Sequence, residues 1–384
     1  MKVVVAIDSF KGSLSTFEAG DAVKAGVLRV YPDAEVKVCP LADGGEGTVA
    51  ALIGALGGRM QTVRVQNPLG QVIESAYGIV PDRAMAVMEM SAAAGITLID
   101  AAARNPLLTT TYGVGEMIAD AMARGCRKFI VGIGGSATND GGVGMLSALG
   151  FAFLDANGEP IVHGAKGLST LSRIEIGGAL PVLKECEFYV ACDVTNPLCG
   201  KEGCSAVYGP QKGATTDMIE DMDAWLGRYA HLTREVIPEA DANASGAGAA
   251  GGMGFAFLAY LGGKLRSGIE LVIDMTELEQ MISDADVVVT GEGRLDAQSC
   301  MGKAPVGVAT AAKRYAKPVI AFSGCVADGA RACNENGIDA YFPILQAPCT
   351  LEDAMKRENA AENLVKTAEQ AFRLIQAFVK FDKK

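Results

Sequence analysis

The chain repeats one local pattern, in which an apolar strand is followed by a polar loop and then by an amphipathic helix. Residues 2–7 (KVVVAI) are a continuous apolar, β-branched run, as in parallel strands that are buried on both faces. The loop DSFKGSLS follows, and apolar residues then recur at helical spacing over residues 17–30. The pattern returns at residues 35–56, and again from residue 285 to a long closing helix expected over 351–379. Strands that alternate with helices in this way predict an α/β fold with a parallel sheet.

The middle of the chain has a different pattern. Between residues 63 and 90, short alternating runs are separated by the turn sequences NPLG and VPDR, which predicts a β-meander. Strand, loop and helix return at residues 127–150. We therefore expect a flavodoxin-like or Rossmann-like three-layer domain formed by residues 1–63 and 285–384, with a mixed α/β domain of residues 64–284 inserted into it. The cleft between two such domains is the expected place of the active site.

Composition excludes several classes of function. The 45 acidic and 34 basic side chains give a net charge of −11, and no basic stripe that would bind nucleic acid is visible. With only two histidines, histidine-based triads and zinc sites are not expected. No apolar stretch is long enough for a signal peptide or a membrane span, and the ten cysteines contain no CxxC pair. We expect a cytoplasmic protein with reduced thiols, a monomer or homodimer, that acts on a small molecule.

Glycine loops are the strongest indication of function. Glycine accounts for 47 of 384 residues, about 12%, against about 7% in average proteins. Six loops combine glycine with acidic, hydroxyl or basic residues: DSFKGSLS (8–15), ADGGEGT (42–48), GIGGSATNDGGVG (132–144), ACDVTNP (191–197), GAGAAGGMG (246–254) and TGEGRLDAQS (290–299). Most of them follow a predicted strand, at the edge where open α/β sheets bind ligands. Loops of this kind let a polyphosphate approach the backbone, so they predict a phosphate site.

Loop 132–144 carries the most specific signal. Its glycines leave the backbone accessible, and its short polar side chains can donate hydrogen bonds to a phosphate. The residues expected to bind the nucleotide there are Gly134, Gly135, Ser136, Asn139, Gly141 and Gly142. Gly248 and Gly251 in loop 246–254 are further candidates, although that loop could equally pack tightly against a neighbour. It contains a literal GxGxxG, but polar residues rather than a strand precede it, which argues against a dinucleotide site.

The acidic residues of these loops are candidates for metal binding and for catalysis. Mg²⁺ prefers carboxylate oxygens, and Asp43, Glu292 and Asp296 are the expected ligands. Asp43 could instead cap the helix that follows its loop. Asp193 follows the apolar run FYVAC and would lie at the sheet edge, where it could act as a general base towards a substrate hydroxyl. An Asx-turn into the following Asn-Pro is the structural alternative for Asp193.

Two loop cations are expected to act on anionic groups. Lys11 and Arg294 follow the ends of predicted strands in the same domain, and they could bind a small carboxylate or a migrating phosphoryl group. Lys212 also lies in a glycine-containing loop, but we expect it only to be solvated. Neither histidine falls in a glycine loop, and no GxSxG, HExxH or Walker A sequence is present. The residues expected to act in catalysis are therefore Asp193, Lys11 and Arg294.

Together these loops resemble the bacterial glycerate kinase family. The matching stretches are DSFKGSLS, ADGGEGT, GIGGSATNDGG, ACDVTNPL, GPQKGA, GAGAAGGMG and GEGRLDAQS, in the family's order and over residues 1 to about 345. The resemblance implies a two-domain α/β fold and phosphorylation of D-glycerate, usually at the 2-hydroxyl, with ATP and Mg²⁺. A kinase that forms 3-phosphoglycerate is the first alternative, and an NAD(P)-dependent dehydrogenase of a small hydroxy acid is a more distant one. A non-catalytic solute-binding protein would share the cleft but has no need of so many loop carboxylates.

Overall fold

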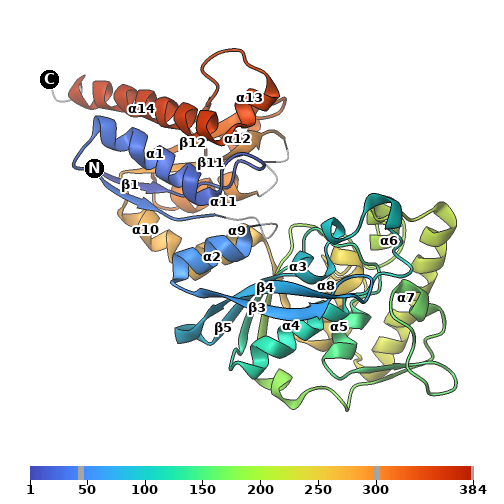
Figure 1. Cartoon of the computed structure of the whole chain (residues 1–384). Coiled ribbons are helices and arrows are strands. Elements are labelled where there is room, and N and C mark those ends of the chain that lie inside the picture. The colour runs from blue at the N-terminus through green and yellow to red at the C-terminus, as the bar shows by residue number, and fades with distance from the viewer. Residues whose placement is uncertain (42–46, 298, 300–302, 382–384) are drawn as a thin grey trace. The chain divides into compact units, whose positions relative to one another are not determined.

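The chain forms two compact units (Figure 1). The structure is a computed structural model that describes residues 1–41, 47–297, 299 and 303–381. Unit 1 comprises Met1–Asp43, Ala50–Leu56 and Ile269–Lys384, and unit 2 comprises Gly44–Val49 and Gly57–Gly268. Both ends of the chain therefore belong to unit 1, and most of unit 2 is inserted between them.

The boundaries between the units fall earlier in the chain than residues 63 and 284, where the sequence pattern placed them. β3 (Arg59–Gln66) pairs along its whole length with β4 (Val72–Val80), so it belongs to unit 2. α10 (Leu278–Asp284) packs against β1 (Lys2–Val5) and belongs to unit 1. Strand pairing and helix packing thus set the division, and these long-range contacts have no local sequence signal.

Unit 1 is built on a five-stranded sheet of order β13-β12-β11-β1-β2, in which all neighbouring strands are parallel. Its other strands are β2 (Glu35–Val38), β11 (Val287–Leu295), β12 (Val319–Val326) and β13 (Ala340–Pro343). The helices that lie mainly in this unit are α1 (Thr16–Val30), α2 (Thr48–Leu56), α9 (Gly268–Thr276), α10, α11 (Ala304–Lys313), α12 (Ala332–Glu335), α13 (Leu351–Met355) and α14 (Arg357–Phe381). The pair α1 and α14 covers one face of the sheet, and α10 and α11 cover the other (Figure 1). The predicted three-layer α/β architecture is confirmed.

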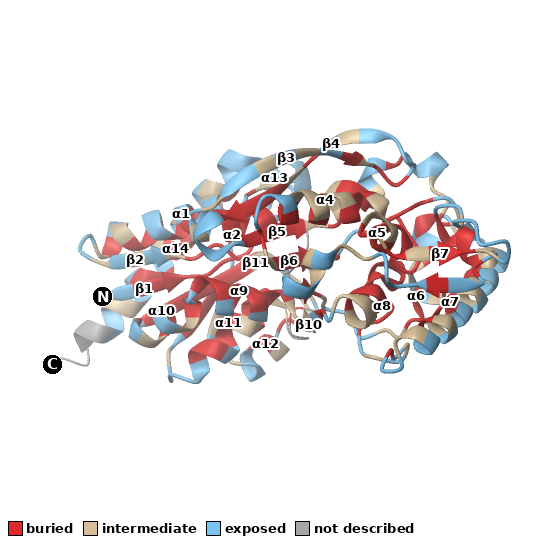
Figure 2. Ribbon diagram, turned by 90° about the horizontal axis from the view of Figure 1, so that it is seen from below, coloured by how far each residue is buried: buried red, intermediate tan, exposed pale blue. Residues whose placement is uncertain are grey.

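The local sequence explains these layers. Val3 and Val5 belong to the core shared with α1 and α14, whereas Val4 between them is buried on the opposite side, so the strand is apolar throughout. Figure 2 shows buried residues along the strands of both units. α1 begins with a capping box, in which Ser15 N–H donates to the Glu18 carboxylate at 2.7 Å and Ser15 Oγ accepts the Glu18 N–H at 3.3 Å.

The closing helix expected over residues 351–379 is interrupted, so the expectation of a single helix was wrong. The backbone leaves the helical region at Lys356 (φ −59°, ψ 127°), which separates α13 from α14. Thr350 caps α13, because its Oγ1 accepts the N–H of Asp353 at 3.1 Å. Neither glycine nor proline marks this break, and the periodic pattern therefore gave no sign of it.

Unit 2 is built on a mixed six-stranded sheet of order β10-β9-β6-β5-β4-β3. Antiparallel pairing of β3, β4 and β5 confirms the predicted β-meander, and the remaining neighbours are parallel. The strands are β3, β4, β5 (Met85–Glu89), β6 (Lys128–Gly132), β9 (Glu187–Ala191) and β10 (Lys264–Arg266), with a separate antiparallel pair β7 (Ala152–Leu154) and β8 (Arg173–Glu175). The helices are α3 (Ser91–Ala94), α4 (Tyr112–Ala123), α5 (Val143–Ala148), α6 (Cys204–Tyr208), α7 (Thr216–Val236) and α8 (Ala249–Tyr260).

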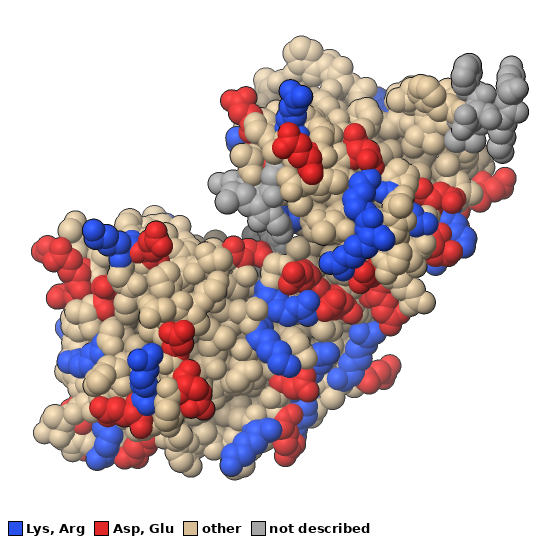
Figure 3. Space-filling model, turned by 180° about the vertical axis from the view of Figure 1, so that it is seen from behind, with Lys and Arg blue, Asp and Glu red and all other residues tan. Residues whose placement is uncertain are grey.

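Short 3₁₀ helices complete unit 2: η1 (Pro81–Arg83), η2 (Ile96–Leu98), η3 (Ala101–Ala103), η4 (Ala165–Ser169), η5 (Pro181–Glu185) and η6 (Pro210–Lys212). On the face drawn in Figure 3, basic and acidic side chains are interspersed, so this face presents no large surface of a single charge. Within the described ranges, no helix combines the length and apolarity needed to cross a bilayer.

Candidate active site

A pocket of about 620 Å³ opens in unit 1 at the carboxyl edge of the five-stranded sheet. Its lining residues end or follow four parallel strands, β1, β11, β12 and β13. From β1 the chain continues to β2 on one side, and it returns through β11 on the other side, so the strand order reverses between β1 and β11. Ligands of open α/β sheets bind at such a switch point. The fold alone therefore makes this pocket a candidate site.

Four predicted site residues line this pocket: Lys11, Glu292, Arg294 and Asp296. Lys11 comes from the loop after β1, Glu292 and Arg294 come from the end of β11, and Asp296 directly follows that strand. Parallel pairing of β1 with β11 brings these distant segments to one edge. Further polar lining residues are Asp8, Ser9, Ser13, Lys303 and Thr350. The structure thus gathers two predicted cations and two predicted metal ligands around one cavity.

The turn after β1 presents Lys11. Asp8 extends the strand pairing, because its N–H donates to Gly291 O at 2.9 Å. Its Oδ1 accepts the N–H of Ser9 at 2.6 Å, and backbone pairing of Phe10 with Leu14 closes the turn. Phe10 is buried, whereas Lys11 is exposed at the tip. The burial of Phe10 therefore fixes the turn and leaves Lys11 in the pocket wall.

Gly291 allows β11 and β12 to continue together beyond the sheet edge. Its φ is +154°, and a Cβ at this position would lie 2.0 Å from Phe322 O. Because any side chain would displace that backbone, glycine is required here. Pairing then continues as far as Leu295 opposite Val326, which carries Glu292 and Arg294 out to the pocket.

Arg294 and Asp296 form an ion pair within the pocket wall. Arg294 Nε lies 3.3 Å from Asp296 Oδ2, and the two side chains are 65% and 23% exposed. Asp296 is also fixed by Ser299, whose Oγ accepts the Asp296 N–H at 3.1 Å and whose N–H donates to Asp296 Oδ1 at 3.3 Å. An exposed pair of this kind contributes only about 0–1 kcal/mol to stability. Arg294 can therefore move to an anionic ligand at little energetic cost.

Carboxylates of this pocket fit a magnesium ion that is bound together with a phosphate. Asp8, Glu292 and Asp296 all line the cavity, so oxygen ligands are present. Within residues 1–41, 47–297, 299 and 303–381, no three His, Cys, Asp or Glu side chains form a ready-made metal site. Mg²⁺ typically uses one or two carboxylates with waters and substrate phosphates, so a complete protein cage is not required. Asp43, the remaining predicted ligand, lies outside the described residues.

The glycine loop 132–144 lies in unit 2 and is mostly buried. Gly134 and Gly135 are exposed, whereas the other predicted nucleotide-binding residues of this loop are covered by protein: Ser136, Asn139, Gly141 and Gly142. Asn139 Nδ2 donates to Ser205 Oγ at 2.8 Å inside the unit. The exposed surface of this loop is therefore limited to Gly134 and Gly135.

Asp140 organises the loop from within. Its carboxylate accepts the N–H and the hydroxyl of Thr111 at 2.8 and 2.9 Å, and the N–H groups of Gly142 and Gly144 at 3.1 and 3.3 Å. Burial raises the pKa of the Asp140 carboxyl, and these hydrogen bonds oppose the shift. The glycines that follow Asp140 thus supply backbone donors to a carboxylate of the chain itself.

Loop 246–254 packs backbone to backbone against loop 132–144. Gly251 has φ +67°, and a Cβ there would lie 2.0 Å from Thr138 O. Gly141 N–H donates to Gly251 O at 2.9 Å, and a Cβ on Gly248 would lie 2.2 Å from Pro197 O. Gly248 and Gly251 therefore serve close packing, which was the structural alternative in the sequence. No strand precedes this GxGxxG, since the nearest element upstream is α7, and the argument against a dinucleotide fingerprint holds.

Lys212 is buried under loop 132–144, so the expectation that it is only solvated was wrong. It ends η6, is 2% exposed, and its Nζ donates to Thr138 O at 2.6 Å. Burial lowers the pKa of Lys212 to about 8, against the opposing effects of Cys204 and Asp140. The motif GPQKGA gave an indirect signal: Gly213 has φ +91°, and a Cβ there would lie 2.4 Å from Arg104 O, so the turn next to Lys212 is closely packed.

Asp193 is exposed in unit 2, two residues beyond the end of β9. Its Oδ1 accepts the N–H of Gly268 at 3.1 Å, which joins the loop after β9 to the chain after β10. Glu89 is a second carboxylate at the end of an apolar strand of unit 2, and the sequence analysis did not single it out. It ends β5, and its Oε1 accepts the N–H groups of Gly47 and Val49 at 3.1 and 3.0 Å. A carboxylate at the end of an apolar strand was the available signal in both cases.

Comparison with known proteins identifies the family. A model of the glycerate kinase family matches residues 3–376. The chain belongs to the glycerate kinase family. A glycerate kinase from Haemophilus influenzae is 46% identical over 98% of this chain and 99% of its own. A glycerate 2-kinase from Escherichia coli K12 is 47% identical over 93% of both chains. The crystal structure of a candidate glycerate kinase 2 from Salmonella typhimurium LT2 has a TM-score of 0.91, 48% identity and 99% coverage of both chains.

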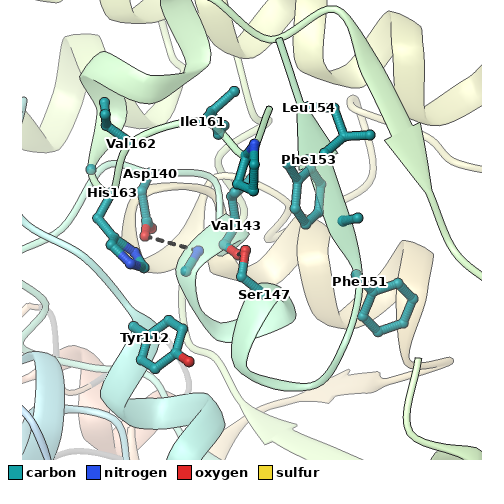
Figure 4. A pocket seen from close by; sticks show the side chains of 14 residues that line it. Tyr112, Asp140, Val143, Ser147, Phe151, Phe153, Leu154, Ile161, Val162 and His163 are labelled. Carbon is teal, nitrogen blue, oxygen red and sulfur yellow. Dashed lines mark hydrogen bonds between the residues drawn. The ribbon is translucent and has the colours of Figure 1, made fainter. Parts of the chain in front are cut away.

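This glycerate kinase family member has a further pocket of about 290 Å³ within unit 2 (Figure 4). Apolar side chains form most of its wall: Val143, Phe151, Phe153, Leu154, Pro160, Ile161 and Val162. Asp140 lies beside it with its hydrogen bond to Gly144, and His163 packs edge-on against Tyr112 at 5.0 Å between ring centres. Because the Asp140 oxygens are already bonded within the loop, this pocket offers fewer groups for phosphate chemistry than the one in unit 1.

Proposed function

We propose that this chain is a kinase that transfers the γ-phosphoryl group of ATP to D-glycerate. Membership of the glycerate kinase family and the names of its relatives support the reaction class and the acceptor. The observation that carries the proposal is the convergence of Lys11, Glu292, Arg294 and Asp296 on one pocket at the switch point of the sheet. Cations and carboxylates in one such cavity are what a magnesium-bound triphosphate requires.

Positioning and charge are the main contributions that the chain makes to this reaction. Phosphoryl transfer passes through a loose transition state, so aligned reactants and neutralised phosphate oxygens lower the barrier. Lys11 and Arg294 are proposed to neutralise the migrating phosphoryl group or the glycerate carboxylate. Asp8, Glu292 and Asp296 are proposed to hold Mg²⁺, directly or through water, and Asp43 remains a predicted ligand. When bound, Mg²⁺ would supply positive charge at the phosphate oxygens.

Asp193 is the proposed base. The glycerate hydroxyl oxygen forms the new bond to phosphorus, the bond between the γ-phosphorus and its bridging oxygen breaks, and ADP leaves. The hydroxyl proton passes to the Asp193 carboxylate. The Asp193 side chain is exposed, so a substrate hydroxyl can reach its carboxylate.

The 2-hydroxyl is the proposed acceptor, which makes 2-phosphoglycerate the product. The Escherichia coli relative, named glycerate 2-kinase, supports this choice. Phosphorus and proton NMR of the product distinguishes the two isomers, because the phosphate couples to the single C2 proton in one and to the C3 protons in the other. A product phosphorylated at C3 would refute the assignment of the acceptor while leaving the kinase reaction intact.

Incubation with ATP, Mg²⁺ and D-glycerate tests the reaction itself. Rapid ADP formation should require all three, and omission of D-glycerate should reduce the rate to that of slow hydrolysis. Titration with NADH, followed by its fluorescence, should give no saturable binding. Absence of glycerate-dependent ADP, or tight binding of NADH, would contradict the proposal.

A further inference from the structure

The pocket of unit 1 is much larger than a three-carbon acid requires. Its volume of about 620 Å³ falls within the range of ~300–1,000 Å³ that is typical of pockets for ligands of drug size. D-glycerate would fill only a small part of this space. The cavity therefore matches the larger of the two proposed substrates.

The lining of this pocket is divided into a charged side and an apolar side. The charged side lies at the ends of β1 and β11 and carries Lys11, Glu292, Arg294 and Asp296. The apolar side comes chiefly from residues 344–355, which follow β13 and include α13. Its apolar side chains are Ile344, Leu345, Leu351, Ala354 and Met355. A nucleoside triphosphate has the same division, with a flat apolar base at one end and a polyanion at the other.

Several large side chains of the 344–355 segment are exposed although they line a cavity. Leu351 is 78% exposed, Leu345 41% and Met355 37%. Single exposed leucines are common on protein surfaces, but three exposed apolar side chains on one pocket wall indicate a binding surface. A bound aromatic base would cover them.

The apolar wall lies next to the turn that carries Lys11. The Met355 methyl group lies 2.8 Å from the position that a Cβ on Gly12 would take, so α13 contacts this turn. Ile344 anchors the start of the wall, because its N–H donates to Ser323 O at 2.8 Å, and the break at Lys356 ends α13. A ligand on the wall is therefore within reach of the charged side of the same cavity.

We propose that residues 344–355 form the base-binding wall of a nucleoside triphosphate site that lies within unit 1. The base packs on Leu345, Leu351 and Met355, and the phosphates lie towards Lys11 and Arg294. The identity of the nucleotide as ATP rests on the proposed function. This assignment moves the triphosphate away from loop 132–144, where the sequence placed it and where most of the predicted residues are buried within unit 2.

Two cysteines of the pocket provide the first test. Cys325 and Cys349 are exposed, free thiols in its lining, and the half-buried Cys186 of unit 2 serves as an internal reference. Alkylation by iodoacetamide is followed for each cysteine by mass spectrometry, with ATP, ADP or D-glycerate alone. At about ten times its dissociation constant, either nucleotide should slow alkylation of Cys325 and Cys349 about tenfold and leave Cys186 unchanged.

A pair of leucine variants provides the second test. Leu351→Ser removes an exposed side chain of the wall, and Leu374→Ser removes a leucine of α14 that is 53% exposed and does not line the pocket. Leu351→Ser should raise the KM for ATP about fivefold to tenfold through lost apolar contact, with kcat and the KM for D-glycerate within about twofold of the parent. Leu374→Ser should change none of the three.

The outcomes separate this inference from the proposed function. Suppose that glycerate-dependent ADP formation is normal. If nucleotides then fail to protect Cys325 and Cys349 from alkylation, or if Leu351→Ser has an unchanged KM for ATP, the nucleotide site is overturned and the kinase proposal stands. Protection by D-glycerate alone but not by ATP would also overturn it. Protection by ATP in a protein that forms no glycerate-dependent ADP would support the site and refute the proposed reaction.

Discussion

The buried lysine of unit 2 gives a quantitative prediction of how stability depends on pH. Lys212 Nζ has Thr138 O as its hydrogen-bond acceptor at 2.6 Å, and the side chain is 2% exposed. Burial lowers the pKa of Lys212 from 10.5 to about 8 in the folded protein. Below pH 8 the lysine is charged in both the folded and the unfolded states, and the folded state bears the full cost of the buried charge. The unfolded chain binds more protons than the folded one between pH 8 and 10.5, so the free energy of unfolding rises with pH there.

The magnitude follows from the two pKa values. Each pKa unit corresponds to about 1.4 kcal/mol, so between pH 7 and pH 9 the wild type should gain about 1.4 kcal/mol relative to Lys212→Met. By pH 10 the gain should reach about 2.5 kcal/mol. Methionine has a similar length and no charge, so this variant lacks the proton equilibrium but keeps most of the packing. Titratable groups that do not interact with Lys212 contribute equally to both proteins and cancel in the difference.

Urea unfolding followed by tryptophan fluorescence measures this difference. Trp225 is the only tryptophan of the sequence and lies in α7 of unit 2, so its signal reports on the unit that contains Lys212. Lys201→Met, at an exposed lysine of the same unit, is the matched control and should follow the wild-type pH dependence. If the free energies of unfolding of the wild type and Lys212→Met change in parallel between pH 7 and pH 10, the lowered pKa of the buried lysine is refuted.

Three further results are expected. Gly251→Ala should destabilise unit 2 by about 3 kcal/mol, because its Cβ would lie 2.0 Å from Thr138 O at a left-handed φ. Gly227→Ala in α7 has open space at its Cβ and should stabilise the unit by about 0.5–1 kcal/mol. Equal urea-unfolding midpoints for the two variants would contradict this packing. Asp193→Asn should reduce kcat about 100-fold with unchanged ATP affinity, since the amide oxygen can still accept from Gly268 N–H, and near-normal turnover would exclude Asp193 as the base. Chelation of Mg²⁺ with EDTA should abolish glycerate-dependent ADP formation, and excess Mg²⁺ should restore it; activity that persists in EDTA would exclude a magnesium requirement.

The layers of unit 1 were predictable because their causes are local. Buried β-branched runs such as Val3–Val5 and the cap at Ser15 act within a few residues, and both are visible in the sequence. The meeting of Lys11 with Arg294 was predictable for a different reason. Parallel strands place their carboxyl ends at one edge whatever their separation in sequence, so two strand-end cations of one sheet share an edge, and the pairing of β1 with β11 then brings them to one pocket.

The roles of the glycines were not predictable from the sequence. A glycine that approaches a phosphate and a glycine that approaches another backbone have the same local pattern. Gly251 contacts the backbone of Thr138, and Gly142 donates to Asp140, so both satisfy groups of the chain itself. Only long-range packing distinguishes the two uses, and it is absent from a single sequence.

The burial of Lys212 and the break in the closing helix escaped prediction for related reasons. A loop lysine is normally solvated, and the direction of this one depends on how η6 packs under loop 132–144. At Lys356, the backbone turns without glycine or proline, and the apolar periodicity continues on both sides. In each case tertiary contacts override a local preference.

Glycerate-dependent ADP formation by variants of the pocket cations is the most direct test of the site in unit 1. Lys11→Met and Arg294→Met each remove one charge from the pocket, and Lys24→Met removes an exposed charge on α1 of the same unit. Both pocket variants should lose at least about 100-fold in kcat/KM, about 2.7 kcal/mol of transition-state stabilisation, while Lys24→Met stays within about twofold of the wild type. Wild-type activity in both pocket variants would contradict the assignment of phosphoryl transfer to this edge of the sheet.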